Sequence, residues 1–289
     1  MNKLFRPQTL GLLSILLLFA AAGFGQPLPS PASWARNLDV RCYKITGPAP
    51  GINLRLDHLN PALVAMGMPF ENVILGQPQD LCVPVSKGTI VPPPDVLPFI
   101  KFLDWKCYGI TGPALNLSLA LNQLNPIIQG LLGPTLNVIV REPQQLCVPV
   151  QKNGSVPPPA VLNLVKWLDV KCYRVESSQD PSGKTVMLTH LNPLITRPPE
   201  TVTFLAPPNP IQLCVPVKKN LVSPPTTVLP LAQFSDVLCY KINGVALDQF
   251  FQLKHQNPVL AGLPIENVTA GISDKLCVPV AKNGFFPPP

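Results

Sequence analysis

The stretches Asp39-Val40-Arg41-Cys42-Tyr43 and Leu81-Cys82-Val83-Pro84-Val85 decide the fold, because each recurs three more times along the chain. The first block returns as Asp104-Trp105-Lys106-Cys107-Tyr108, Asp169-Val170-Lys171-Cys172-Tyr173 and Asp236-Val237-Leu238-Cys239-Tyr240. The second block returns at residues 146–150, 213–217 and 276–280. All eight cysteines and all four tyrosines of the chain fall in these blocks. Self-similarity at a nearly fixed period indicates a repeat architecture.

Two further features recur with the blocks. An Asn-Pro step lies between the blocks of each copy, at residues 60–61, 125–126, 192–193 and 257–258. A lysine follows each second cysteine by five positions, namely Lys87, Lys152, Lys219 and Lys282. We therefore predict four repeats, 26–94, 95–159, 160–225 and 226–289, which we call repeats 1 to 4. They take up the chain from residue 26 onward, so we expect no separate catalytic domain.

The composition favours a loop-rich β protein. The 289 residues include 39 prolines, and only 13% are charged. Prolines spread along the whole chain exclude a helical bundle, a coiled coil or a helical solenoid. The hydrophobic share of 46% is large enough to bury a core.

The N-terminal segment predicts export. Lys3 and Arg6 precede an apolar run over residues 10–24, and small residues follow before Gln26. This layout is typical of a secretory signal peptide, here residues 1–25. An uncleaved membrane anchor is the alternative, but the run is shorter than the roughly 20 residues that span a bilayer. We expect no membrane span in the mature chain, and a location outside the cell, in the periplasm or at the cell surface.

The net charge of +7 does not indicate nucleic-acid binding. The positive residues are scattered, and Lys218-Lys219 is their only adjacent pair. A nucleic-acid interface needs a basic stripe, usually with stacking aromatic residues.

Each repeat contains the pattern of several short strands. Residues 115–121 alternate Leu115, Leu117, Leu119 and Leu121 with small or polar residues, which is typical of a strand with one buried face. Residues 96–103 and 161–168 follow proline clusters and fit either a short helix or an extended link. The predicted fold is a mainly β, tandem array of four small disulfide-stapled modules, each sandwich- or barrel-like, joined by Pro-rich links. The separation from the second Cys of one repeat to the first Cys of the next is always 25 residues, which predicts that the repeats are arranged as a semi-rigid rod or arc.

Two disulfide patterns fit the spacing. Pairing within each repeat joins Cys42 to Cys82, Cys107 to Cys147, Cys172 to Cys214 and Cys239 to Cys277. Pairing across repeats gives a constant separation of 25 residues but leaves Cys42 and Cys277 at opposite ends of the chain. We favour the first pattern, in which each closed loop would contribute about 4 kcal/mol. Every repeat should then fold alone when oxidised.

A resemblance can be stated on these motifs. Cys-Tyr-Lys, then a central strand, then Leu-Cys-Val-Pro-Val-x-Lys resembles a repeat module of secreted bacterial proteins known only as a domain of unknown function. The resemblance spans residues 26–289 and is loosest in the centre of repeat 3. It implies a secreted bacterial origin and tandem occurrence, and it brings no activity and no catalytic residues.

The three histidines are the best candidates for chemistry, since His58, His190 and His255 share one repeat column. Repeat 2 has Gln123 in that column. We expect a structural hydrogen bond that either residue type can make. A metal site would need several converging ligands, which no single repeat provides.

The remaining candidates also have structural explanations. We expect the aspartates at the block starts (Asp39, Asp104, Asp169, Asp236) to make hydrogen bonds at turns or strand edges. We expect the block tyrosines to pack on the disulfides. Residues 182–185, Ser-Gly-Lys-Thr, lack the first glycine of a phosphate-binding loop, so we interpret them as a turn.

The sequence thus predicts no catalytic residue, no cofactor and no metal. The favoured function is a non-catalytic extracellular protein that presents a repeated surface to an envelope, polysaccharide or protein partner, or to another copy of itself. A secreted polymer-degrading enzyme and a protease inhibitor are the alternatives. Repetition would raise avidity without a strong single site.

Overall fold

The computed structural model describes residues 27–289, so the predicted signal peptide lies outside the described residues. Strands make up 45% of the structure and helices 13%. The prediction of a mainly β fold with four disulfide-stapled repeats is confirmed.

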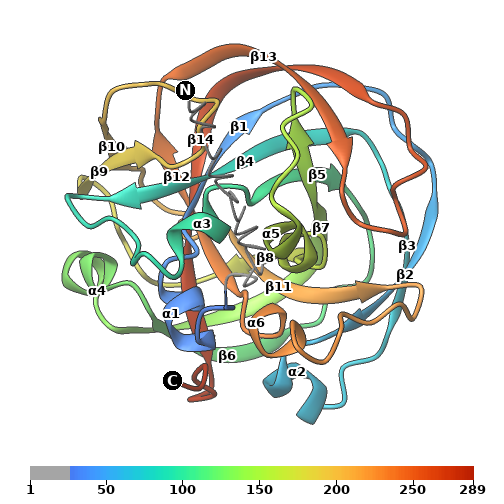
Figure 1. Ribbon diagram of the computed structural model, residues 1–289. Helices are drawn as coiled ribbons and strands as arrows, with labels where there is room; N and C mark the ends of the chain where they lie inside the picture. Colours follow the sequence, from blue (N-terminus) through green and yellow to red (C-terminus); the bar gives the residue numbers. More distant parts are fainter. Residues whose placement is uncertain (1–26) are drawn as a thin grey trace, which may run out of the picture.

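Eight strands close into a single cylindrical sheet, which we call the cylinder (Figure 1). Each repeat contributes two of them, in the order β1 (Val40–Lys44), β4 (Pro78–Lys87), β5 (Asp104–Gly109), β7 (Thr135–Lys152), β8 (Val170–Glu176), β11 (Gln212–Lys219), β12 (Val237–Asn243) and β14 (Glu266–Lys282). All neighbouring pairs are antiparallel. The sheet closes because β14 pairs with β1, where Val40 lies opposite Cys277.

The predicted rod or arc is therefore wrong. Each 25-residue link folds back, so that the second cylinder strand of one repeat lies antiparallel to the first strand of the next. After four such steps the chain has returned to its starting strand. Closure pairs the two strands that a rod would leave as exposed edges, and such edges invite aggregation.

The other six strands lie outside the cylinder and form four arms around it (Figure 1). They are β2 (Asn53–His58), β3 (Glu71–Ile74), β6 (Leu117–Gln123), β9 (Thr185–His190), β10 (Glu200–Phe204) and β13 (Ala246–His255). β2 pairs with β3, and β9 with β10, whereas β6 and β13 pair with the first halves of the long strands β7 and β14.

The arms interlock the repeats. Each arm packs on the outer face of the next repeat, as Leu54 and Val73 of repeat 1 do against Tyr108 and Val148 of repeat 2. Its central strand then pairs with the repeat after that: β2 with β11, β6 with β14, β9 with β4 and β13 with β7. A single repeat thus lacks both the cover and the strand partner that other repeats supply. For this reason we now expect that a single repeat does not fold alone.

The alternation of side chains along the cylinder strands separates two cores. Cysteines and their same-face neighbours, such as Val40 and Trp105, point inward and form one buried cluster. The adjacent tyrosines point outward, and they belong to the clusters beneath the arms. The prediction that the tyrosine rings pack on the sulfurs is therefore wrong, because successive residues of a strand face opposite sides.

Helices cover one end of the cylinder, the end that faces the viewer in Figure 1. They are α1 (Pro31–Arg36), α3 (Leu97–Ile100), α5 (Pro159–Val165) and α6 (Leu229–Ala232). Trp34, Phe99, Leu164 and Leu231 of these helices join the cysteine cluster. Residues 96–103 and 161–168 thus contain helices, which settles the choice that the sequence left open.

Two further helices begin at Asn-Pro steps and lie at the periphery (Figure 1). They are α2 (Pro61–Ala65) and α4 (Pro126–Leu132). Asn60 and Asn125 cap them by accepting hydrogen bonds from backbone N–H groups, and the proline occupies the first helical position.

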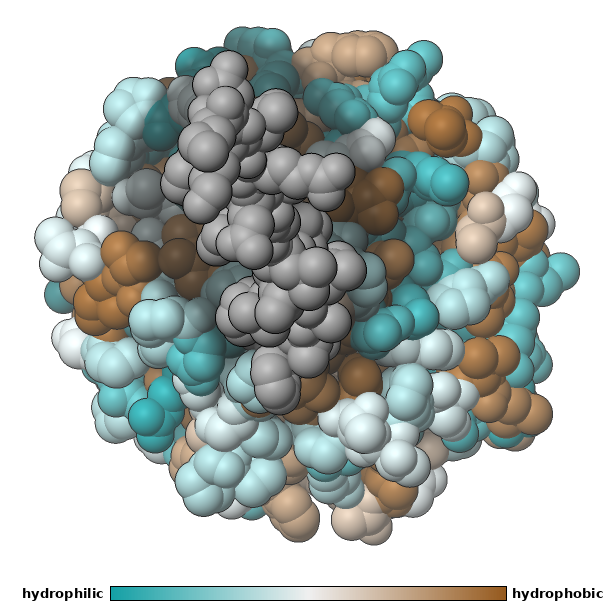
Figure 2. All heavy atoms as spheres, viewed as in Figure 1, coloured by the Kyte–Doolittle hydropathy of each residue, from teal (hydrophilic) through white to brown (hydrophobic). Residues whose placement is uncertain are grey.

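On the coloured part of the helix-covered face, Figure 2 shows hydrophobic residues in small groups among hydrophilic ones. Within residues 27–289, none of the helices is long and apolar enough to cross a membrane.

Candidate functional site

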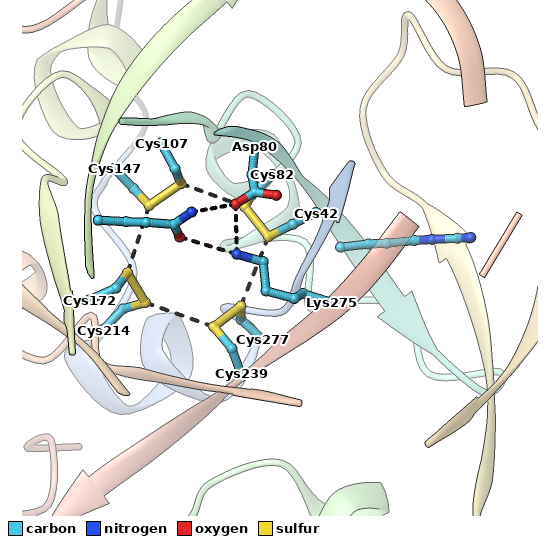
Figure 3. The surroundings of a disulfide bond; sticks show 12 residues. Cys42, Asp80, Cys82, Cys107, Cys147, Cys172, Cys214, Cys239, Lys275 and Cys277 are labelled. Atoms are coloured by element: carbon cyan, nitrogen blue, oxygen red, sulfur yellow. Dashed lines mark hydrogen bonds and ion pairs between the residues drawn. A yellow bond between two sulfur atoms is a disulfide. The ribbon is translucent and has the colours of Figure 1, made fainter. Parts of the chain in front are cut away.

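The four disulfides lie inside the cylinder and join Cys42 to Cys82, Cys107 to Cys147, Cys172 to Cys214 and Cys239 to Cys277 (Figure 3). Each lies within one repeat, so the favoured one of the two predicted pairings is confirmed. The bonded cysteines are directly opposite each other in the ladder, as Cys42 is to Cys82. Disulfides of this number are typical of an oxidising compartment.

Four buried ion pairs connect the recurring aspartates and lysines. Each joins the Asp at the start of the first cylinder strand of a repeat, or one residue before it, to the Lys at the end of its second strand: Asp39 with Lys87, Asp104 with Lys152, Asp169 with Lys219 and Asp236 with Lys282. These residues are at most 3% exposed. The predicted hydrogen bonds exist, but the aspartates are not at exposed edges.

The asparagine of the next repeat completes each pair. Its amide nitrogen donates to the aspartate at 2.5 to 3.0 Å, as Asn125 does to Asp39 and Asn60 of repeat 1 does to Asp236 of repeat 4. Burial raises the pKa of Asp169 and Asp236 to about 6, although Lys219 and Lys282 oppose the shift. Burial also lowers the pKa of both lysines against the pull of the aspartates. These clusters act as clamps between consecutive repeats.

The histidine column meets the tyrosine column under the arms. His190 Nε2 lies 2.9 Å from Tyr43 Oη, His255 Nε2 lies 2.8 Å from Tyr108 Oη, and His58 Nε2 lies 3.2 Å from Tyr173 Oη. In the fourth position, Gln123 Nε2 donates to Tyr240 Oη at 2.8 Å. The prediction of a hydrogen bond that histidine or glutamine can both make is confirmed.

A carboxylate and a cation complete the three histidine clusters. Tyr108 Oη donates to Glu266 at 3.1 Å, and Lys106 Nζ lies 2.5 Å from the other oxygen of Glu266. Tyr173 donates to Glu71, which also pairs with Lys171. In these two clusters the tyrosine O–H donates to the carboxylate, so the tyrosine oxygen accepts a hydrogen bond from the Nε2–H group of the histidine. In the third cluster Arg41 is the cation and pairs with Glu200 at 2.6 Å.

The fourth cluster carries no charge. Leu238 replaces the cation, and Tyr240 donates to Gln179 rather than to a glutamate. The cation, the carboxylate and the histidine are thus replaced together. A set of His, Glu, Tyr and a cation resembles catalytic machinery, but three such sets, two with lysine and one with Arg41, enclosed between the cylinder and its arms indicate a structural role.

One position breaks the repeat symmetry inside the cylinder. The residue two places before each second cysteine points inward with that cysteine, and it is Asp80, Gln145, Gln212 or Lys275. Lys275 Nζ donates to Asp80 at 2.6 Å, to Gln145 Oε1 at 3.1 Å and to Gln212 Oε1 at 3.2 Å. Gln145 Nε2 donates to Asp80 at 2.6 Å. Figure 3 shows Asp80 and Lys275 beside the disulfides.

Three members of this polar layer, Gln145, Gln212 and Lys275, form the floor of a hollow of about 360 Å³ at the end of the cylinder away from the helices, which we call the mouth. Asp80 is fully buried and contacts the floor through Lys275 and Gln145. Polar side chains surround it, namely Lys44, Gln79, Gln144 and Asp274, and Ile110, Pro143 and Ile211 supply apolar wall. Lys44 Nζ bridges Asp80 at 3.0 Å and Asp274 at 2.9 Å. Two lysines and two aspartates therefore balance, and the mouth has no net charge.

The floor of the mouth is held in one ionisation state. Burial opposes ionisation of Asp80, but Lys275 and Lys44 outweigh it and hold the pKa of Asp80 below its usual range. The ammonium of Lys275 has an acceptor for each of its three protons. Asp80 therefore stays ionised, and Lys275 is fully engaged in hydrogen bonds.

Sequence reasoning missed the mouth, although the signal was present. The four residues share one repeat column and one strand face with the cysteines, yet they are polar and differ from repeat to repeat. A variable polar residue on the buried face of an otherwise uniform repeat marks a position that the fold alone does not dictate.

The fold and the mouth define a closed, disulfide-linked β protein with one polar hollow on its axis. No known family model, no curated protein and no solved structure matches the chain. The resemblance to a secreted repeat module therefore stays a prediction.

Proposed function

We propose that this protein is an exported, non-catalytic binding protein, and that its mouth binds a neutral, hydroxyl-rich ligand such as the end of a glycan chain. The observation that carries the proposal is the layer of Asp80, Gln145, Gln212 and Lys275. At four equivalent positions the chain has a carboxylate, two amides and an ammonium, which converge on one point.

The cost of this layer supports a role in binding. Burying charged and amide groups is expensive even when they are paired, and apolar residues of similar size are often as stable or more so. Apolar residues already fill the next inward layer of the cylinder, where Val40, Val170 and Val237 lie. The polar layer is therefore not a requirement of closing the sheet.

The chemistry of the mouth favours hydroxyl groups over ions. A hydroxyl both donates and accepts, and the mouth offers amide donors, amide acceptors and paired charges side by side. Its charges cancel, so a free anion or cation gains little there. A volume of about 360 Å³ lies near the lower end of the range for small-molecule sites, which suits one or two sugar units.

The fixed ionisation of Asp80 favours binding over hydrolysis. Glycoside hydrolysis commonly needs one protonated carboxyl as general acid and a second carboxylate. Here Lys44 bridges Asp80 and Asp274, and the lowered pKa of Asp80 keeps it ionised. Because the proposed site is a single mouth on the axis, this proposal does not rely on avidity from a surface repeated in all four repeats.

The test uses residues 26–289 on an array of neutral and anionic oligosaccharides, followed by calorimetry with the neutral glycans that bind. Gln144→Ala removes a half-buried amide of the mouth, and we expect about a tenfold loss of affinity for one lost hydrogen bond. Asp274→Asn should weaken binding by a similar factor. Asp95→Asn changes an exposed carboxylate outside the mouth and serves as the matched control.

Equal affinity of the parent, Gln144→Ala and Asp274→Asn proteins would place the ligand elsewhere on the molecule. Binding of anionic glycans alone would contradict the neutral chemistry proposed for the mouth.

A further inference from the structure

The eight sulfur atoms form a closed ring inside the cylinder (Figure 3). Neighbouring disulfides touch across the boundaries between repeats, at 3.8 Å for Cys82 and Cys107, 3.7 Å for Cys147 and Cys172, and 3.8 Å for Cys214 and Cys239. The last contact joins the ends of the chain, with Cys42 and Cys277 at 3.9 Å. Every sulfur thus has one bonded neighbour and one contacting neighbour.

Closure makes the second disulfide pattern complete. In a linear array, pairing across repeats would leave Cys42 and Cys277 unpaired. In the ring, these two cysteines are neighbours, so the pattern 82–107, 147–172, 214–239 and 277–42 also uses all eight. The two patterns have the same number of bonds and differ only in which contacts are covalent.

We propose that this ring is an internal thiol–disulfide exchange relay, in which one thiolate exchanges with the neighbouring disulfide and so moves the free thiol from repeat to repeat. Such exchange proceeds by attack of a thiolate on a disulfide sulfur through direct contact. The four contacts between repeats supply that neighbour at every step, and the proposal does not depend on what the mouth binds.

The relay needs an external thiol to start, and its electrons then balance. A small dithiol reduces Cys42–Cys82, gives two electrons and two protons, and becomes a disulfide itself. The Cys82 thiolate attacks Cys107; the Cys82–Cys107 bond forms, the Cys107–Cys147 bond breaks, and Cys147 leaves as the new thiolate. Each such step keeps three disulfides and two reduced cysteines.

Two more steps carry the thiolate to the other end of the chain. Cys147 attacks Cys172 and releases Cys214, which attacks Cys239 and releases Cys277. The reduced pair is then Cys42 and Cys277, which are neighbours in the ring. Oxidation of that pair by a small disulfide completes the second pattern and returns two electrons and two protons to the outside.

The polar layer supplies both an approach and a stabilising charge. Gln145, Gln212 and Lys275 line the mouth and also the small cavity at the sulfur ring, so these side chains lie between the two spaces. The cysteines themselves are at most 3% exposed. A nearby ammonium stabilises a thiolate over a thiol, and Lys275 is the cation of this cavity.

The experiment places one free thiol in the intact ring. Cys42→Ser in the mature chain leaves Cys82 unpaired beside three native disulfides. After incubation at pH 8, the protein is acid-quenched, labelled with N-ethylmaleimide in denaturant, and mapped by mass spectrometry without reduction. The relay predicts that the N-ethylmaleimide label is found not only on Cys82 but also on Cys147, Cys214 and Cys277. It also predicts peptides that contain the new Cys82–Cys107 disulfide.

A second variant should place the label on the other set of cysteines. Cys277→Ser frees Cys239, and the relay then predicts label only on Cys239, Cys172, Cys107 and Cys42. The double variant Cys42→Ser/Cys82→Ser has no free thiol and should keep three native disulfides. If neither single variant folds, the parent protein with one equivalent of dithiothreitol should yield all four cross-repeat peptides, including Cys42–Cys277.

Two outcomes overturn the proposal. Label confined to Cys82 in the Cys42→Ser protein, or only native peptides in the parent, means that no exchange occurs in the ring. Label on all seven cysteines means that exchange passes through unfolded chains instead of along the contacts.

Discussion

Replacing His58, His190 and His255 together by glutamine should remove much of the protein's sensitivity to acid. Burial lowers the pKa of His58 and His255 to about 3 and that of His190 to about 4, with nearby cations adding to the shift. The Nδ1 atom of each ring has no hydrogen-bond partner, so a proton added there would be unsatisfied. The folded protein therefore keeps these rings neutral at pH 5.

The sign of the effect follows from the lowered values. An unfolded histidine titrates near 6.5, so between pH 6.5 and about 4 the unfolded chain binds protons that the folded chain does not. Stability present above pH 6.5 is then lost as the pH falls. At pH 5 the loss is about 2 kcal/mol for a fully buried ring and nearer 1 kcal/mol for a partly exposed one, or about 4 to 6 kcal/mol for the three.

Urea unfolding at pH 7.5 and pH 5.0, followed by the fluorescence of buried Trp34 and Trp105, measures this loss. Asp169 and Asp236, with a pKa raised to about 6, contribute in the opposite direction, because the folded state binds their protons more tightly. They are present in both proteins, so the difference between parent and variant isolates the histidines.

The native fourth cluster provides the controls. Glutamine should keep the bond to each tyrosine, as Gln123 does to Tyr240, so the triple variant should match the parent at pH 7.5 within about 1.5 kcal/mol. Conversely, Gln123→His should add about 1 to 2 kcal/mol of acid lability. If the triple variant loses as much stability between pH 7.5 and pH 5.0 as the parent, the histidines are not the acid-sensitive groups.

Three further predictions concern the architecture. Lys152→Met leaves the Asp104 carboxylate buried without its cation and should lower the free energy of unfolding by about 3 to 5 kcal/mol, measured with urea at pH 7. Adding Asp104→Asn should restore part of this loss. If the effects of the two substitutions are simply additive, the two residues are not coupled. Residues 95–159 alone should remain unfolded by circular dichroism even with their disulfide, because β6 pairs with repeat 4; a cooperative transition would show that one repeat carries its own core. Gly76→Ala should destabilise the protein by about 1 to 3 kcal/mol, since a Cβ would lie 2.9 Å from a backbone oxygen of Gly109, and an unchanged urea midpoint would mean that the two backbones separate easily.

Much of the fold could be predicted because it depends on local spacing. The alternation at residues 115–121 matches β6 (Leu117–Gln123) closely. The sequence favours disulfides within repeats because pairing across repeats leaves Cys42 and Cys277 at opposite ends of the chain, and the structure pairs the cysteines within repeats. The exchange of histidine for glutamine in one column predicted a bond that both can make.

The partners of these columns could not be predicted. Nothing in the spacing indicates that Tyr43 of repeat 1 meets His190 of repeat 3, because that contact depends on how far an arm reaches across the next repeat. The tyrosines were misplaced for a related reason: the neighbouring cysteine suggested contact, whereas strand geometry sends adjacent side chains to opposite faces.

The sequence by itself determined the four repeats, their strands, their disulfides and the residues that occupy equivalent positions. Only the tertiary structure decided that the repeats close into a cylinder, that Cys42 meets Cys277, and that Asp80 and Lys275 meet inside it from the two strands that flank β1. The physical reason is that the same rotation relates each repeat to the next, but no residue pattern in the sequence gives the angle of that rotation. A quarter turn per repeat closes four units into a ring, whereas a smaller turn from the same local strands would leave a rod with two open edges.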